Sequence, residues 1–249
     1  TAKKTSELMD IPEDAVLVAS TGVIGKQLPI DRICAGVEQM SKKLSGDLTS
    51  GHNAALAIMT TDTHEKEAAV EVELSGKKVT IGGMCKGSGM IHPNMCTMLS
   101  FITTDAAISK EMLQEALSST VTDTYNMISV DGDTSTNDTC LVLANGLAGN
   151  EKIKEKNEDY ETFCEALYYV NEALAKMMAG DGEGATALFE VKVVHAASKE
   201  DAVILSKSVV TSSLTKAAIF GHDANWGRIL CAIFKCLSSS LNSFTTTAS

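Results

Sequence analysis

Short β-branched apolar runs alternate along this chain with longer segments in which apolar residues recur every three or four positions. Runs of the first kind are typical of strands, and repeats of the second kind are typical of helices with one buried face. The alternation therefore predicts a mixed α and β fold. The predicted strands cover residues 15–19, 54–60, 69–74, 78–84, 127–130, 140–145 and 189–196.

Turn and cap residues indicate where several of these elements begin or end. Gly76 lies in the short polar connection between 69–74 and 78–84, which predicts an antiparallel hairpin. Ser109 can cap one helix, and Gly180 can end another. The predicted helices cover 30–44, 109–118, 163–180, 199–217 and 225–237.

Composition and charge narrow the class of protein. The chain has 249 residues, of which 44% are hydrophobic and 21% are charged, as in ordinary globular proteins. Its net charge is -11, which argues against a nucleic acid or an anionic membrane as partner. No apolar segment is long enough to span a bilayer. A small-molecule substrate fits this balance better.

The cysteines and histidines show no metal-ligand pattern. The seven cysteines are dispersed without a C-x-x-C pair, and the five histidines lack the H-x-x-x-H spacing of a zinc helix. We therefore expect no metal, reduced thiols and a cytoplasmic protein.

Two glycine-containing turns are candidates for ligand binding. STGVIG (20–25) follows a predicted strand, so it is either an ordinary turn or a nest of backbone N–H groups that binds an anion. GDGEGAT (180–186) places Glu183 between two glycines. That segment is either a tight turn with an exposed acid or a carboxylate placed where the backbone lets a ligand approach closely.

Two further polar segments resemble known motifs only superficially. KGSG (86–89) has its glycines and lysine in the wrong order for a phosphate-binding P-loop. DGDTSTND (131–138) lacks the glycine and glutamate that a calcium loop needs, since Thr136 and Val142 stand at those positions. A polar turn with Asx-type hydrogen bonds is the favoured interpretation of the second segment.

The segment GGMCKGSGMIHPNMCTML (82–99) surrounds Thr97 with glycines and small residues. A threonine hydroxyl needs a base, and an N-terminal threonine can use its own α-amine, which titrates near about 8. Such a threonine is exposed only if the chain is cut before it, and flexible residues upstream favour that reaction. The alternative is a buried threonine in a strand.

Six stretches together resemble the successive motif blocks of the ornithine acetyltransferase (glutamate N-acetyltransferase, ArgJ) family. They follow the family's order over about 210 residues. The stretches are STGVIG, AIMTTDT, GGMCKGSGMIHPNMCTML, SVDGDTSTNDT, GDGEGATALFEV and AIFGHDANWGRI.

The resemblance implies a DmpA/ArgJ-like self-processing fold, an α/β sandwich with an N-terminal nucleophile. Cleavage would fall between Cys96 and Thr97 and give an α chain, 1–96, and a β chain, 97–249, that stay together. Paired αβ units, an α2β2 heterotetramer, are implied as well.

The implied reaction belongs to arginine biosynthesis and needs no cofactor. Thr97 would take the acetyl group from N2-acetylornithine and pass it to glutamate in a ping-pong scheme. Acetyl-CoA is a possible second donor. Thr21 and Gly22 match the oxyanion hole of the family. Thr60, Lys86, Thr97 and Glu183 match its substrate-contacting positions, with Lys86 suited to a substrate carboxylate and Glu183 to the ornithine amine or to proton transfer.

The chain departs from the family pattern at several places. Cys96 stands where alanine is usual, Ala187 where lysine is usual, and Ala224 where proline is usual. The family's N-terminal block and C-terminal segment are expected to be missing. Two other functions therefore stay open: a fold-related N-terminal-nucleophile aminopeptidase and a non-catalytic, truncated member.

Overall fold

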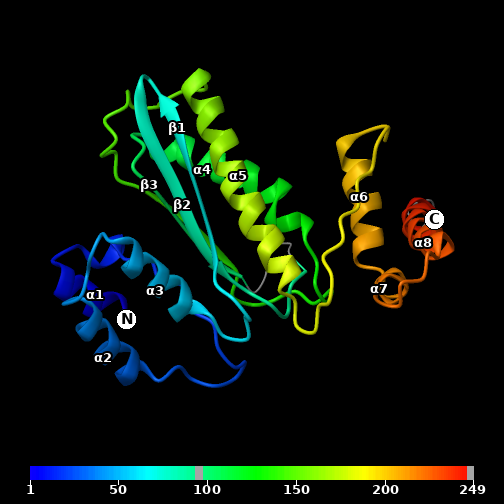
Figure 1. Cartoon of the computed structure of the whole chain (residues 1–249), viewed down its shortest axis with the longest axis horizontal. Helices are drawn as coiled ribbons and strands as arrows, with labels where there is room; N and C mark the ends of the chain where they lie inside the picture. The colour runs from blue at the N-terminus through cyan, green and yellow to red at the C-terminus, as the bar shows by residue number, and fades with distance from the viewer. Residues whose placement is uncertain (93–97, 246–249) are drawn as a thin grey trace.

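The computed structural model describes residues 1–92 and 98–245, with side chains up to residue 236. Within these residues one four-stranded sheet forms the centre of the molecule, in the order β1-β2-β3-β4 (Figure 1). β1 pairs with β2 and β2 with β3 in antiparallel fashion, whereas β3 and β4 are parallel. The bounds are β1 Lys66–Leu74, β2 Lys77–Lys86, β3 Leu99–Thr104 and β4 Thr139–Ala144. The mixed α and β fold is confirmed.

The hairpin between β1 and β2 forms as predicted, and its turn is two residues long. Ser75 and Gly76 have φ values of 49° and 69°, and Leu74 pairs with Lys77. Two successive residues with positive φ match the right-handed twist of a hairpin, which glycine tolerates without strain. Asp159 also accepts a hydrogen bond from Ser75 N (3.0 Å), which ties the turn to the helix above it.

Helices α4 (Lys110–Asp123) and α5 (Glu158–Gly180) cover one face of the sheet (Figure 1). Each begins at a capping side chain: Ser109 accepts from Met112 N (3.3 Å), and Asn157 accepts from Tyr160 N (2.9 Å). Both ends that the sequence predicted for this pair, the cap at Ser109 and the stop at Gly180, are confirmed.

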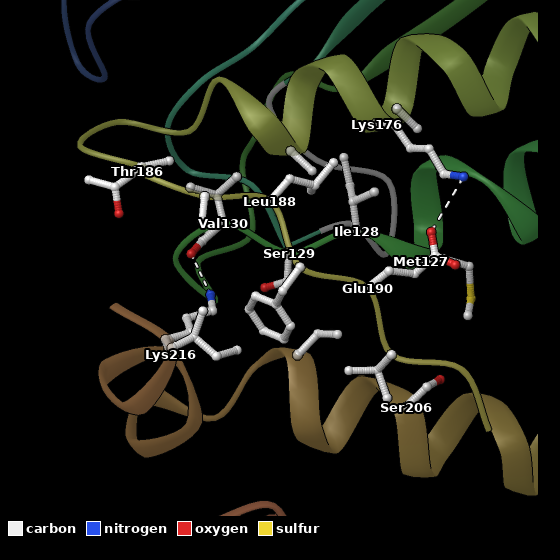
Figure 2. Close-up of a pocket in the computed structure, with 18 of the residues that line it drawn as sticks. Met127, Ile128, Ser129, Val130, Lys176, Thr186, Leu188, Glu190, Ser206 and Lys216 are labelled. Carbon is white, nitrogen blue, oxygen red and sulfur yellow. Dashed lines mark hydrogen bonds and ion pairs between the residues drawn. The ribbon is translucent and has the colours of Figure 1, made fainter. Parts of the chain in front are cut away.

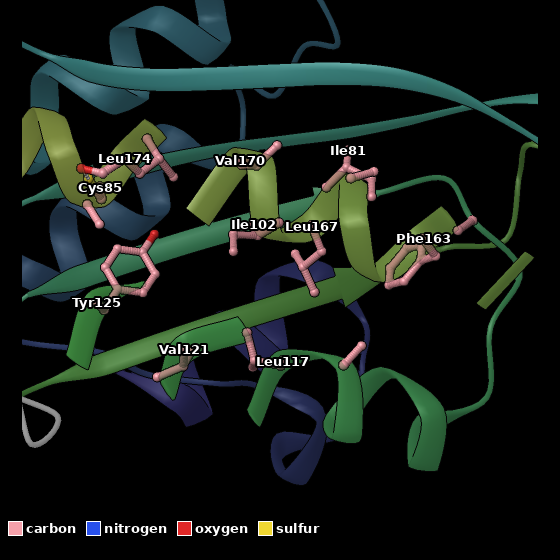
Figure 3. Close-up of a cluster of buried hydrophobic side chains, with 14 of the residues drawn as sticks. Ile81, Cys85, Ile102, Leu117, Val121, Tyr125, Phe163, Leu167, Val170 and Leu174 are labelled. Carbon is pink, nitrogen blue, oxygen red and sulfur yellow. Dashed lines mark hydrogen bonds between the residues drawn. The ribbon is translucent and has the colours of Figure 1, made fainter. Parts of the chain in front are cut away.

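The core lies between α5, α4 and the sheet, and α5 buries a stripe along one side (Figure 3). Spacings of three and four residues put these side chains on one helix face. The buried stripe consists of Phe163, Leu167, Val170, Leu174 and Met178. Gly83 of β2 permits the close contact, because a Cβ there would lie 3.1 Å from Leu174 Cδ1.

The remaining helices lie at the two ends of the molecule (Figure 1). α1 (Ala2–Met9) packs on α2 (Ile30–Met40), and α3 (Leu48–Ile58) contacts β1 and β2. Beyond α5 follow α6 (Lys199–Val210), α7 (Ser213–Phe220) and α8 (Trp226–Thr245). In the described residues no single helix is long and apolar enough to cross a membrane; α6 and α7 reach that length only as a pair bent by 58°.

Several strand predictions are wrong. The run 54–60 belongs largely to α3, which the Asp47 side chain caps by accepting from Ser50 N (2.7 Å) and whose second half, AALAI, is rich in alanine and leucine, both good helix formers. The runs 15–19, 127–130 and 189–196 have no strand partner in the described residues. Conversely, 99–104 is a strand, β3, although the sequence marked it only as apolar.

We predict that Leu174→Ala lowers the free energy of unfolding by about 2–5 kcal/mol, because it empties a fully buried site. Leu147→Ala is the matched control, since Leu147 is 81% exposed and its loss should cost less than about 0.5 kcal/mol. Urea denaturation of both variants measures the difference. Equal costs would contradict the assignment of Leu174 to the core.

Candidate functional site

A fully buried ion cluster lies where β1 begins. Lys66 Nζ contacts Asp62 Oδ1 at 2.8 Å and Asp181 Oδ2 at 2.6 Å, and it also donates to the His64 carbonyl oxygen (3.2 Å). The Lys66 and Asp62 side chains are 0% exposed, and that of Asp181 is 3% exposed. Because a buried charge is costly without partners, this cluster holds together only as a unit.

The two carboxylates of this cluster also bind backbone N–H groups from separate parts of the chain. Asp62 accepts from Gly87 N (2.7 Å) and Thr60 N (3.1 Å). Asp181 accepts from Thr63 N (2.9 Å) and from the Thr63 hydroxyl. The cluster thereby fixes the 60–63 segment, the end of β2 and the end of α5 against one another.

In this cluster the effect of hydrogen bonding on the pKa values exceeds the opposite effect of burial. Burial raises the pKa of Asp181, but the hydrogen bonds from Lys66 and Thr63 more than compensate and lower that pKa to about 2. Burial opposes the charged form of Lys66, yet its bonds to Asp181 and Asp62 raise the pKa of its ammonium. All three groups are therefore charged at neutral pH.

Three of the residues that the sequence singled out meet at the end of β2. Lys86 is its last residue and only 4% exposed, yet its ammonium forms no hydrogen bond or salt bridge within the described part of the chain. Thr60 is exposed and tied by its N–H to Asp62, which also binds the next residue after Lys86.

Glu183 reaches the same end of β2 from the turn after α5. Its N–H donates to the Ser88 carbonyl oxygen (2.7 Å). Its carboxyl group lies against Gly89, where an added Cβ would stand 2.7 Å from Glu183 Cδ. The absence of a side chain at Gly89 therefore lets the Glu183 carboxylate lie close to the backbone there; whether a ligand approaches Glu183 stays a prediction.

Cys96 and Thr97 lie outside the described residues, but the chain that follows them lies beside the end of β2. Leu99, two residues after Thr97, pairs with Lys86 across the β2–β3 ladder. Thr21 and Gly22 lie in the connection between the short turn Glu13–Ala15 and α2. Since no described contact joins them to the end of β2, their role in an oxyanion hole stays a prediction.

Sequence reasoning missed two aspartates that bind the chain on either side of 93–97. Asp131 accepts from Met90 N (2.6 Å) and Ile91 N (3.0 Å), and Asp138 Oδ1 accepts from Met98 N (2.7 Å). The predicted Asx-type bond is present too, from Asp133 N to Asp131 (3.0 Å). Both aspartates were visible in the sequence as the first and last residues of DGDTSTND. They were overlooked because the segment was interpreted as a polar turn.

A cleft of about 450 Å³ opens beside this site, between the 184–191 segment, α5 and helices α6 and α7 (Figure 2). Lys216 spans it to the Val130 carbonyl oxygen (2.5 Å), and Lys176 pairs with Glu190 (3.4 Å). Of the residues predicted for the site, Glu183 alone lines the cleft, next to Ala187. We therefore place the candidate site at the end of β2.

No three His, Cys, Asp or Glu side chains of residues 1–92 and 98–236 are grouped to hold a metal.

We predict that Lys66→Met costs about 3–5 kcal/mol of stability, because two buried carboxylates lose their counter-ion. Lys78→Met is the matched control: Lys78 pairs with Glu71 (2.8 Å) at the surface, where such a pair is worth about 0–1 kcal/mol. Urea denaturation at pH 7 compares them. Similar losses in both variants would contradict a supporting role for the cluster.

We also predict a distinct acid dependence. The pKa of Asp181 falls from an ordinary 3.8 to about 2 on folding, so its stabilising contribution is complete above 3.8 and lost as pH falls toward 2. The difference in the free energy of unfolding between the original protein and Asp181→Asn should therefore be largest at pH 5–7. This difference should shrink as pH approaches 2. Denaturation midpoints across that range test this; a gap that is constant with pH would refute it.

Comparisons with known proteins agree on one family. The ArgJ family model matches residues 1–243. The arginine biosynthesis bifunctional protein ArgJ 1 of Clostridium acetobutylicum is 56% identical over 93% of this chain and 56% of its own length. The ArgJ protein of Caldanaerobacter subterraneus subsp. tengcongensis is 53% identical over 93% of this chain and 57% of its own. The chain thus spans about half the length of the curated relatives it matches.

A solved structure agrees in fold. The crystal structure of the arginine biosynthesis bifunctional protein ArgJ from Bacillus halodurans is similar with a TM-score of 0.55 and 53% sequence identity. The similarity covers 56% of this chain and 66% of that one. Family model, relatives and fold all lead to one conclusion: this chain belongs to the ArgJ family.

Proposed function

We propose that this protein is an acyltransferase of arginine biosynthesis that moves an acetyl group from N2-acetylornithine to glutamate. The observation that supports it most directly is Lys86 at the end of β2, a residue only 4% exposed whose ammonium has no ion-pair partner among the described residues. A lysine of this kind suits the α-carboxylate that both substrates carry. It also faces Leu99, two residues from the proposed nucleophile.

The nucleophile would be made by self-cleavage between Cys96 and Thr97. Thr97 Oγ attacks the Cys96 carbonyl carbon, a C–O bond forms, the C–N bond breaks, and the hydroxyl proton goes to the leaving nitrogen. Water then hydrolyses the ester and returns the hydroxyl to Thr97. The products are a carboxylate at Cys96 and a free α-amine at Thr97, which can serve as the base of the transfer reaction.

Acetyl transfer then takes two steps. Thr97 Oγ attacks the acetyl carbonyl of N2-acetylornithine, and ornithine leaves as the amine. The glutamate amine attacks the acetyl ester and restores the hydroxyl. Lys86 would hold the substrate carboxylate, Thr60 would contact the substrate beside it, and Glu183 would pair with the ornithine side-chain amine or move a proton. Thr21 and Gly22 would stabilise the oxyanion, a contribution of roughly 10²–10³ per donor.

The sheet explains how two cleaved chains would stay together. β1 and β2 belong to 1–96, and β3 and β4 belong to 97–249, so the β2–β3 ladder would join the α and β chains. The proposal further includes a cytoplasmic α2β2 assembly, no cofactor and acetyl-CoA as a possible second donor. These features rest on the family resemblance.

We predict that Thr97→Ala leaves a single chain and lowers acetyl exchange between acetylornithine and glutamate at least about 10³-fold, because covalent catalysis is lost. Thr97→Ser is the control that keeps the hydroxyl and should still cleave. Intact mass and N-terminal sequencing follow cleavage, and acetylornithine with a labelled acetyl group follows exchange. Exchange by the alanine variant would refute the nucleophile. Peptide hydrolysis without exchange in the original protein would favour the aminopeptidase alternative.

We predict that Gly89→Ala impairs transfer while the fold is kept. The three atoms nearest the new Cβ all belong to the flexible end of Glu183, so it should displace that carboxylate at little cost in stability. We expect a KM for acetylornithine raised about tenfold, a loss of about 1.4 kcal/mol in binding. Gly36→Ala, where a Cβ meets nothing within 4 Å, is the control. An unchanged KM in Gly89→Ala would remove Glu183 from the substrate site.

A further inference from the structure

The chain leaves β2 through the stretch 87–91, whose backbone is held at both ends by aspartates. Asp62 accepts from Gly87 N (2.7 Å) at one end. Asp131 accepts from Ile91 N (3.0 Å) at the other end. These two anchors leave the middle of the stretch to be fixed by other bonds.

Ser88 lies in the middle of this stretch and forms hydrogen bonds in two directions. Its hydroxyl oxygen lies 2.6 Å from the hydroxyl oxygen of Thr61, and its carbonyl oxygen accepts from Glu183 N (2.7 Å). Ser88 is only 1% exposed, whereas Thr61 is exposed. The serine therefore joins the segment before β1 to the turn after α5.

Glu183 rests on two successive residues of this stretch. Its backbone N–H donates to the Ser88 carbonyl oxygen, and its carboxyl group faces Gly89, where an added Cβ would stand 2.7 Å from Cδ and Oε1 of the glutamate. The peptide group between Ser88 and Gly89 lies between these two contacts. A rotation of that peptide group would therefore displace Glu183 at its backbone and at its side chain together.

The bond between the Ser88 and Thr61 hydroxyl groups opposes such a rotation, because it fixes the side chain of the residue whose carbonyl group holds Glu183. It also couples Glu183 to Thr60, a proposed substrate contact that directly precedes Thr61. The bond matters little for folding, since the exposed Thr61 hydroxyl group can bind water in its absence.

We propose that Ser88 and Thr61 are positioning residues that give the site its preference for a substrate with a side-chain amine. Their hydrogen bond holds Glu183 where its carboxylate pairs with that amine. This role rests on the proposed function, in which Glu183 binds the ornithine side-chain amine, and adds two residues to it. A carboxylate discriminates between substrates only while it is held in place, because a mobile one is satisfied by water whether the amine is present or not.

Two acetyl donors measure this preference: N2-acetylornithine and N2-acetylnorvaline, which has the same carbon chain but lacks the side-chain amine. The measured quantity is the ratio of their kcat/KM values in acetyl transfer to glutamate. Ser88→Ala and Thr61→Val break the hydrogen bond from its two sides, whereas Thr61→Ser keeps a hydroxyl group. Thr122→Val is the matched control, because Thr122 is an exposed threonine of α4 whose hydroxyl group donates to the Ser118 carbonyl oxygen (3.0 Å).

We expect Ser88→Ala and Thr61→Val each to lower the ratio about tenfold, through a higher KM for acetylornithine, while kcat/KM for acetylnorvaline changes less than about threefold. The double variant should lose no more than either single variant, because both remove the same bond. Thr61→Ser should retain most of the preference. The melting temperature should fall by less than about 4 °C in each variant. Thr122→Val should match the original protein.

Glu183→Gln tests whether the two hydroxyl groups act through Glu183. Alone, this variant should lower the ratio at least as much as Ser88→Ala does, because the amide cannot form the ion pair. Adding Ser88→Ala to it should lower the ratio no further. A further loss in the combined variant would show that Ser88 acts by another route and would overturn the proposal.

The remaining outcomes separate this proposal from the proposed function. If the original protein transfers acetyl groups and prefers acetylornithine, but Ser88→Ala and Thr61→Val keep that preference, the two residues have no positioning role. Equal losses for both donors, with a clear drop in melting temperature, would mark a purely structural bond and refute the role as well. If the original protein moves no acetyl group from acetylornithine to glutamate, the proposed function itself fails, and this role with it.

Discussion

The candidate site depends on one ammonium held between two carboxylates that are buried with it. Lys66 occupies the first position of β1, and the acids that bind it come from the segment before that strand and from the end of α5. The cluster has one more negative than positive charge, and Lys86, a second lysine of low exposure, stands next to Gly87, whose N–H Asp62 binds. Charge pairing and backbone hydrogen bonds thus hold the same part of the molecule together, at the end of β2.

Elements whose contacts are local could be predicted from sequence, and those with distant contacts could not. The β1–β2 hairpin follows from Gly76 and the alternation beside it, and α5 follows from its stripe and its terminal glycine. In contrast, the apolar run 54–60 predicts a strand, but most of it belongs to the helix α3, which the Asp47 side chain caps. The strand β3 lies between β2 and β4, a neighbourhood that no local pattern specifies.

The candidate site shows the same division. Thr60, Lys86 and Glu183 were found through the family resemblance, and the structure brings them to one end of β2. The residues that support them were missed, because aspartate beside glycine or threonine is ordinary in turns. What distinguishes Asp181 is a partner 115 positions away in the sequence, a relation that only the folded chain reveals.

The single sheet also has a kinetic consequence. An uncut chain folds by joining segments of one molecule, and the short connection from β2 to β3 keeps their effective concentration high. Severing that connection would turn reassembly after unfolding into an encounter of two molecules, slower in dilute solution and open to aggregation. The mature form would then persist through slow unfolding rather than through reversible folding, so that its lifetime is set by a rate.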